Sequence, residues 1–174
     1  MKSKKNIVFL GMMGSGKTSI GKLISKKLKL DFFDIDENIE KNLKMKISKI
    51  FNEKGENFFR KYEEKLTLDI LKKDNIVISL GGGAFLNKII RQEILLNHLS
   101  FWLKWDSQIL ASRIENSTKR PLVSNLTKND LINMSEKRSN IYSKAMYTID
   151  CNNLTKNEIV SKVINKYEPN KIIN

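Results

Sequence analysis

The segment from Gly11 to Thr18 carries the clearest chemical signal in this chain. It reads Gly-Met-Met-Gly-Ser-Gly-Lys-Thr and fits the pattern G-x-x-x-x-G-K-[ST], in which glycines let the backbone N–H groups curl around an anion. In that pattern Lys17 reaches the β- and γ-phosphates of a nucleotide, and the Thr18 hydroxyl ligates Mg²⁺. An apolar run precedes the segment and an amphipathic helical pattern follows it, so the motif has its usual strand–loop–helix context.

Two aspartates and a run of glycines follow other predicted strands. Asp34 and Asp36 close an extended stretch, and alternation along a strand would point both carboxylates the same way. One carboxylate could orient Mg²⁺ through water while the other accepts a hydroxyl proton, or both could simply cap the next helix. Gly81–Gly83 follow a buried strand, and three glycines favour close approach of the backbone to a ligand over a tight turn.

Three arginines are candidates for binding anions. Arg60 lies in a predicted helix beside aromatic residues, and Arg138 lies in the middle of another. Arg120 lies in a polar, aperiodic segment at residues 115–126, which we expect to be a mobile lid that could close over the transferring phosphate. Composition alone favours an exposed surface charge for each of the three.

Strands alternate with helices along the whole chain, and this alternation predicts how these residues are positioned. Expected strands lie at residues 7–10, 31–36, 76–80, 99–105 and 147–150, and the two tryptophans of the fourth are expected in the core. A short helix that Ser48 could cap should stop at Gly55, and a longer one should begin at about Glu56. The pattern predicts an α/β domain with a parallel sheet, helices on both faces, and ligands at the carboxyl ends of the strands.

Composition predicts one globular domain over residues 1–174 in a reducing cytoplasm. The hydrophobic content is 40%, no apolar run reaches membrane-spanning length, and the first strand begins too early to leave room for a signal peptide. The single cysteine, Cys151, excludes an internal disulfide, and the single histidine, His98, argues against histidine triads and zinc sites.

The net charge of +13 has an ordinary explanation in solvated lysines. The lysines are spread along every predicted helix, and no dense basic block is interleaved with aromatic residues. We therefore expect no nucleic-acid partner and no membrane partner, and small-molecule substrates bound by a monomer.

Taken together, these motifs resemble those of the shikimate kinase family over nearly the whole chain. Beyond the phosphate loop, the resemblance rests on an ordered set of elements: Phe33-Asp34-Ile35-Asp36, Phe59-Arg60 with Glu63, Leu80-Gly81-Gly82-Gly83, Arg120-Pro121-Leu122, and Arg138 with Tyr142. Many kinases share the phosphate loop, but far fewer share this order of elements. The resemblance implies a phosphate-loop, nucleoside-monophosphate-kinase-like fold, a three-layer sandwich around a five-stranded parallel sheet.

The resemblance also implies an activity and a role for each site residue. The activity is transfer of the γ-phosphate of ATP to the 3-hydroxyl of shikimate with Mg²⁺, on the pathway to chorismate and aromatic amino acids. The ATP-binding residues would be Gly14, Ser15, Gly16, Lys17, Thr18, Ser19, Arg113 and Arg120. The shikimate-binding residues would be Asp36, Arg60, Gly82 and Arg138, with a shikimate-binding helical region at about residues 36–62. The metal residues would be Thr18 and Asp34, and the catalytic ones Lys17, Asp36 and Arg120.

Two other functions remain open at this point. A gluconate-type or nucleotide kinase of the same architecture would share the phosphate loop, and gluconate also offers a carboxylate and hydroxyls. A basic nucleotide-binding protein acting on nucleic acid would require a clustered basic face. The chain also departs from the family pattern in having Asn140-Ile141-Tyr142 where Pro-Leu-Tyr is common, and we expect this change to leave Arg138 in place.

Overall fold

The computed structural model describes residues 6–115 and 126–168, the side chain of Glu115 excepted. The strands are β1 (Ile7–Leu10), β2 (Asp31–Asp34), β3 (Ile76–Ser79), β4 (Leu99–Lys104) and β5 (Tyr147–Asp150). The helices are α1 (Lys17–Leu28), α2 (Ile35–Leu43), α3 (Ile47–Leu71), the 3₁₀ turn η1 (Ala84–Leu86), α4 (Lys88–Asn97), α5 (Ser107–Glu115), α6 (Lys128–Tyr142) and α7 (Lys156–Tyr167).

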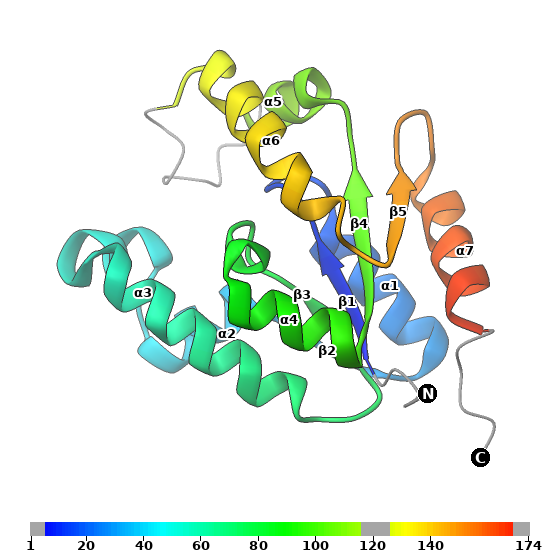
Figure 1. Cartoon of the computed structure of the whole chain (residues 1–174), viewed down its shortest axis with the longest axis horizontal. Coiled ribbons are helices and arrows are strands. Elements are labelled where there is room, and N and C mark those ends of the chain that lie inside the picture. The colour runs from blue at the N-terminus through cyan, green and yellow to red at the C-terminus, as the bar shows by residue number, and fades with distance from the viewer. Residues whose placement is uncertain (1–5, 116–125, 169–174) are drawn as a thin grey trace.

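The strands form one sheet in the order β2-β3-β1-β4-β5, and every pairing is parallel. The phosphate loop follows the central strand β1, so the ends of β3 and β4 lie on either side of it. The helices α5 and α6 lie beyond the edge toward which the strands point (Figure 1). The predicted α/β sandwich with a five-stranded parallel sheet is therefore confirmed.

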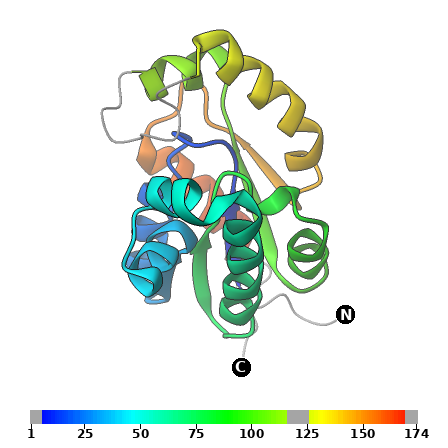
Figure 2. The same ribbon diagram turned by 90° about the vertical axis from the view of Figure 1, so that its left-hand side faces the viewer.

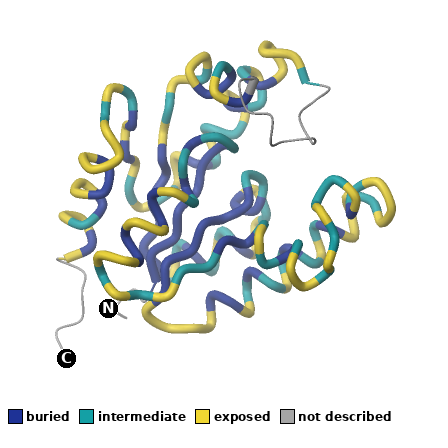
Figure 3. The backbone as a smooth tube through the Cα atoms, turned by 180° about the vertical axis from the view of Figure 1, so that it is seen from behind, coloured by how far each residue is buried: buried dark blue, intermediate teal, exposed yellow. Residues whose placement is uncertain are grey.

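The two faces of the sheet bury separate apolar clusters because alternate residues of each strand point to opposite sides. Ile7 and Phe9 pack with α1 and α7, whereas Val8 and Leu10 pack with residues of α2, α3 and α4. Figure 3 shows the buried strands at the centre, with the helices carrying the exposed residues around them. A rigid core thus supports the loops at the carboxyl edge.

The helix α3 bends at Gly55, where the backbone angles are φ 79° and ψ 166°. A residue without a side chain adopts such angles at little cost, so the helical segments on both sides of Gly55 are joined at a kink. The break at Gly55 agrees with the expected helix boundary, although Lys46, and not Ser48, precedes the first turn. The bend sets the direction of the part of α3 that carries Arg60, and Figure 2 shows α3 from its own side of the molecule.

Two details of the expected fold were wrong. Strand β2 ends at Asp34, which caps α2 by accepting a hydrogen bond from the Glu37 N–H, so Asp36 lies in the first turn of a helix and not on a strand. Strand β4 ends at Lys104, so Trp105 lies beyond it and is only half-buried, whereas Trp102 is in the core. Both residues therefore lie in segments that follow the carboxyl ends of strands.

No helix in residues 6–115 or 126–168 is long and apolar enough to cross a membrane.

Candidate active site

The loop between β1 and α1 has the backbone geometry that a phosphate cradle needs. Gly11, Gly14 and Gly16 adopt φ values of 135°, 76° and 90°, which side-chain-bearing residues rarely adopt. Gly16 caps α1, so the positive end of the helix dipole faces the loop. The Lys17 ammonium is almost fully buried and donates hydrogen bonds to the carbonyl oxygens of Gly11 and Met12, each at 2.9 Å. Its charge is therefore held within the arch of the loop.

The two predicted metal residues are in direct contact. The Thr18 hydroxyl lies 2.6 Å from Oδ2 of Asp34, and Asp34 is almost fully buried. One hydroxyl and one carboxylate are hard oxygen donors, which suit a cation that takes its remaining ligands from water and phosphate. The part of the chain that the structure describes contains no group of three or more acidic, histidine or cysteine residues suited to hold a metal unaided.

Asp36 and Glu63 both approach Gly81, which follows strand β3. A Cβ atom placed on Gly81 would lie 2.7 Å from Oδ1 of Asp36 and 2.7 Å from Oε1 of Glu63. Contacts that short occur essentially never, so only glycine allows both carboxylates to lie where they are. Gly81 thus allows the close approach of carboxylates from α2 and α3. The expected approach of a ligand to the glycine run stays a prediction.

Arg60 lies on the same side of the glycine loop. Its guanidinium donates to Glu63 at 2.8 Å and to Glu56 at 3.2 Å, and a Cβ on Gly83 would lie 2.8 Å from its Nη1 atom. The guanidinium carbon also lies 5.1 Å from the centre of the Phe59 ring. Two carboxylates and a ring therefore hold the guanidinium beside the loop, and Arg60 is not a freely solvated charge.

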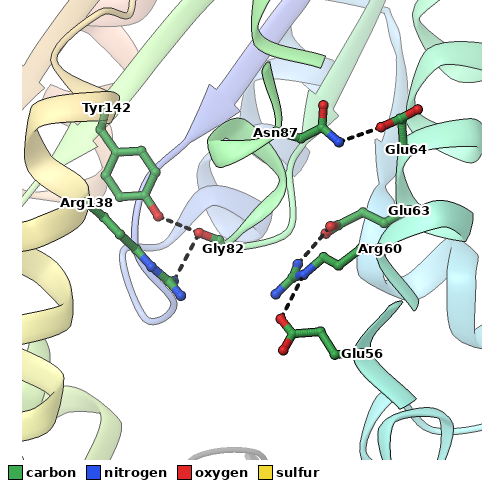
Figure 4. Close-up of polar contacts among 8 residues, drawn as sticks. All are labelled: Glu56, Arg60, Glu63, Glu64, Gly82, Asn87, Arg138 and Tyr142. Atoms are coloured by element: carbon green, nitrogen blue, oxygen red, sulfur yellow. Dashed lines mark hydrogen bonds and ion pairs between the residues drawn. The ribbon is translucent and has the colours of Figure 1, made fainter. Parts of the chain in front are cut away.

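Arg138 approaches the glycine loop from the opposite side, on α6. Its guanidinium donates to the carbonyl oxygen of Gly82 at 3.3 Å, and the buried Tyr142 hydroxyl donates to the same oxygen. Figure 4 shows Gly82 between Arg138 and Tyr142 on one side and Arg60 and Glu63 on the other. Asn140 and Ile141 stand between Arg138 and Tyr142 in this chain, and both Arg138 and Tyr142 contact Gly82.

Electrostatics in this cluster follow from burial and from the arginines. Burial raises the pKa of the Glu63 carboxyl, although the neighbouring Arg60 guanidinium and the charge of Arg138 partly oppose the shift. Burial lowers the pKa of Arg60, but the charge and hydrogen bond of Glu63 outweigh it and leave this pKa raised. Burial raises the pKa of the Tyr142 hydroxyl. Arg60 therefore stays a cation and Tyr142 a hydrogen-bond donor at neutral pH.

The remaining predicted nucleotide residues lie on the other side of the phosphate loop or outside the described residues. Arg113, in the last turn of α5, lies over the indole ring of Trp105, the first residue after β4. Arg120 and all of the expected lid except its first and last residues fall in the segment 116–125, which lies outside the described residues. The roles of both arginines remain predictions.

The family assignment is decided by comparison with known proteins. A family model described as shikimate kinase matches residues 13–168. The chain belongs to the shikimate kinase family. A shikimate kinase from Thermodesulfovibrio yellowstonii is 40% identical over 165 residues, which cover 94% of this chain and 95% of the relative. The structure of a shikimate kinase from Acinetobacter baumannii in complex with shikimate is 26% identical, covers 98% of this chain and 97% of that one, and has a TM-score of 0.88.

The rival small-molecule kinase shares only the fold with this chain. A gluconokinase structure from Sinorhizobium meliloti covers 95% of this chain and 92% of its own, with 16% identity and a TM-score of 0.60. Similarity at that level of identity indicates a common architecture and says nothing about the acceptor. Shikimate kinases are ATP-dependent phosphotransferases, so the expected enzyme class of this chain is confirmed along with its family.

Sequence reasoning overlooked three side chains that the shikimate kinase fold places at the site. Glu63 and Tyr142 belonged to the motifs of the resemblance but had no assigned role, and Trp105 was expected in the core. The spacing of Glu63 three residues after Arg60 is a detectable signal, because residues i and i+3 share a helix face. The Tyr142 hydroxyl bond to Gly82 joins residues 60 apart and leaves no local pattern.

Proposed function

We propose that this chain transfers the γ-phosphate of ATP to the 3-hydroxyl of shikimate. The observation that carries the proposal is the arrangement of Arg60 and Arg138 on opposite sides of Gly82, at the same edge of the sheet as the phosphate loop (Figure 4). Shikimate offers one carboxylate and three hydroxyls, and planar guanidinium groups suit the carboxylate. The acceptor region then comprises residues 36–62 with contributions from β3 and α6.

On the acceptor side, we assign the hydroxyls of shikimate to Asp36. Its carboxylate lies against Gly81, in the same run of glycines that Arg60 and Arg138 approach. A carboxylate there can accept the hydroxyl proton as the phosphoryl group moves, and the backbone at Gly82 can contact the acceptor directly. The arginines hold the opposite end of the molecule, so the reacting hydroxyl points toward the γ-phosphate.

On the donor side, we assign the phosphates of ATP to the loop amides and to Lys17. The Thr18 hydroxyl and the Asp34 carboxylate, in contact with each other, would hold Mg²⁺, which neutralises developing charge on the phosphates. The remaining work of phosphoryl transfer is positioning, which the rigid loop and the helix dipole of α1 provide. Arg113 and Arg120 complete the proposed set of nucleotide residues.

Turnover that depends on shikimate is the direct test of this proposal. We expect purified protein with Mg-ATP to produce ADP many times faster when shikimate is added, and gluconate to give no stimulation. A coupled ADP assay over a panel of hydroxy acids measures both. Stimulation by gluconate but not by shikimate would refute the acceptor assignment while leaving the kinase chemistry intact.

Removing either arginine should weaken shikimate binding selectively. Arg60→Ala and Arg138→Ala are each expected to cost roughly 2–5 kcal/mol of acceptor binding, much of it from a carboxylate left poorly paired. The KM for shikimate should rise and the affinity for ATP should change little. Arg→Lys should rescue poorly because an ammonium cannot form the planar fork. Steady-state kinetics with each substrate varied in turn measures these effects.

Exposed lysines adjacent to the two arginines provide matched controls. Lys61→Ala and Lys137→Ala remove a positive charge from the same helices and should leave both KM values unchanged. A shikimate analogue without the carboxylate should bind weakly and respond little to either arginine variant. Equal weakening of both ligands by an arginine variant would show that the arginine does not bind the carboxylate.

We also propose that the enzyme acts in the cytoplasm as a monomer without a nucleic-acid partner. The buried Cys151 thiol, whose pKa burial raises to about 12, is unreactive and suits a reducing compartment. A salt-dependent affinity for DNA or RNA would contradict the last part of this proposal.

A further inference from the structure

Trp105 connects the end of strand β4 to the phosphate loop. Its indole N–H donates a hydrogen bond of 3.0 Å to the carbonyl oxygen of Ser15, a residue 90 positions away in the sequence. Strands β1 and β4 are neighbours, with Leu10 paired to Trp102, so the segment after β4 lies beside the loop after β1. Trp105 therefore contacts the loop that we assign to the phosphates of ATP, although its position in the sequence gave no sign of this.

Trp105 also contacts Arg113, whose guanidinium stacks on the indole ring. The guanidinium carbon of Arg113 lies 3.6 Å from the centre of an indole ring, which is a close cation–π contact. Asp106 caps α5 by accepting from the backbone N–H of Gln108 at 2.8 Å, and this cap sets the start of the helix that carries Arg113. Trp105 is half-buried, while Arg113 is exposed. A planar guanidinium with one face on the indole keeps its second face for another flat group.

The order of the strands places this stack where the base of ATP should lie. The acceptor groups, Asp36 and Gly81–Gly83, follow β2 and β3, on one side of the central strand β1. Trp105 and Arg113 follow β4, on the opposite side. Because the attacking and leaving oxygens lie roughly in line in phosphoryl transfer, the ADP part of ATP extends away from the acceptor. The base thus leaves the loop on the side of β4.

We propose that Trp105 is a positioning residue for the nucleotide: it holds the Arg113 guanidinium flat as a platform for the purine of ATP, and it ties that platform to the phosphate loop through Ser15. The proposal rests on the function proposed above only in taking the loop as the ATP site. Binding of ADP without any acceptor tests it, so its outcome is independent of the outcome for shikimate.

Two substitutions of Trp105, with a control at Lys104, separate the contribution of the ring from that of its N–H group. Trp105→Leu removes the stacking surface and should raise the Kd for ADP about 5- to 30-fold, with the Kd for shikimate unchanged. Trp105→Phe keeps a ring but not the donor, and should raise the Kd for ADP by less than Trp105→Leu does. Lys104→Ala, at the exposed preceding residue, is the matched control and should bind ADP as the unmodified protein does. Isothermal calorimetry measures each Kd, and thermal unfolding shows whether each variant folds.

A double-substitution cycle tests whether Trp105 acts through Arg113. Arg113→Ala changes an exposed side chain, so it should fold, and it should weaken ADP binding. In the Trp105→Leu background the same change should add little, because the platform is already lost. Additive effects of the two substitutions, or an Arg113→Ala variant that binds ADP normally, would overturn the proposal.

Fluorescence supplies a readout that a purely structural role would not move. The chain has two tryptophans, so Trp102→Phe leaves Trp105 as the single emitter. ADP should change its emission strongly and inorganic pyrophosphate, which lacks a base, should change it less. Equal responses to the two ligands would mean that Trp105 senses only the phosphates, and the platform would be refuted.

Discussion

Lys17→Ala is expected to lower kcat by about 10²–10³-fold while the protein stays folded. The Lys17 ammonium is held inside the loop by the Gly11 and Met12 carbonyl oxygens, so its charge is preorganised where negative charge moves during phosphoryl transfer. An interaction that strengthens in the transition state affects kcat more than ground-state binding. Steady-state kinetics at saturating ATP and shikimate measures the loss, and circular dichroism verifies the fold.

Lys26→Ala is a suitable control for this experiment. Lys26 lies on the same helix, α1, and is exposed, so its removal changes net charge equally without touching the loop. We expect normal turnover from this variant. A folded Lys17→Ala variant that kept most of its activity would contradict the assignment of Lys17 to the phosphates.

Asp36→Asn is expected to lower kcat by about 10²–10⁴-fold, the usual contribution of a general acid or base. The amide keeps the shape of the side chain beside Gly81 but cannot accept the hydroxyl proton. The affinity for ATP should remain near that of the unmodified protein, because Asp36 is on the acceptor side. Calorimetry for ATP and steady-state rates together measure this separation.

A loss of ATP affinity in the Asp36→Asn variant would contradict this assignment, because Thr18 and Asp34 are the residues that we assign to the metal side. If Asp36→Asn reduced ATP affinity and turnover equally, Asp36 would belong to the metal side and would exchange roles with Asp34. Glu37→Gln changes the exposed carboxylate next to Asp36 and should leave turnover intact. Loss of turnover in that control would show that the effect comes from the charge at the start of α2.

Much of the scaffold could be predicted because it depends on local rules. The glycines of the phosphate loop need φ values that other residues avoid, and Gly55 interrupts a helix for the same reason. Caps are equally local: Asn87 accepts from the first N–H groups of α4, and Thr155 forms a capping box with Glu158 at α7. Apolar strand residues followed by amphipathic helices led to the parallel sheet.

Local rules were insufficient where a residue had two permitted states. The stretch from Asp31 to Asp36 could continue as a strand or turn into a helix. The Asp34 side chain settled this by capping α2 at Glu37, which placed Asp36 in the first turn. Trp105 could be part of an apolar strand, but the chain leaves β4 one residue earlier and its N–H bonds the phosphate loop.

The sequence by itself determined the phosphate loop, the alternation of strands and helices, and the residue types available for chemistry. Only the tertiary structure decided which of them meet. Arg60 on α3 and Arg138 on α6 come together at the glycine loop because strand order and helix packing place them there, and no short-range pattern relates them. Glu63 and Tyr142 fix their surroundings through contacts of the folded chain. Backbone preferences act between neighbours in sequence, whereas a binding site depends on distances between elements far apart in it.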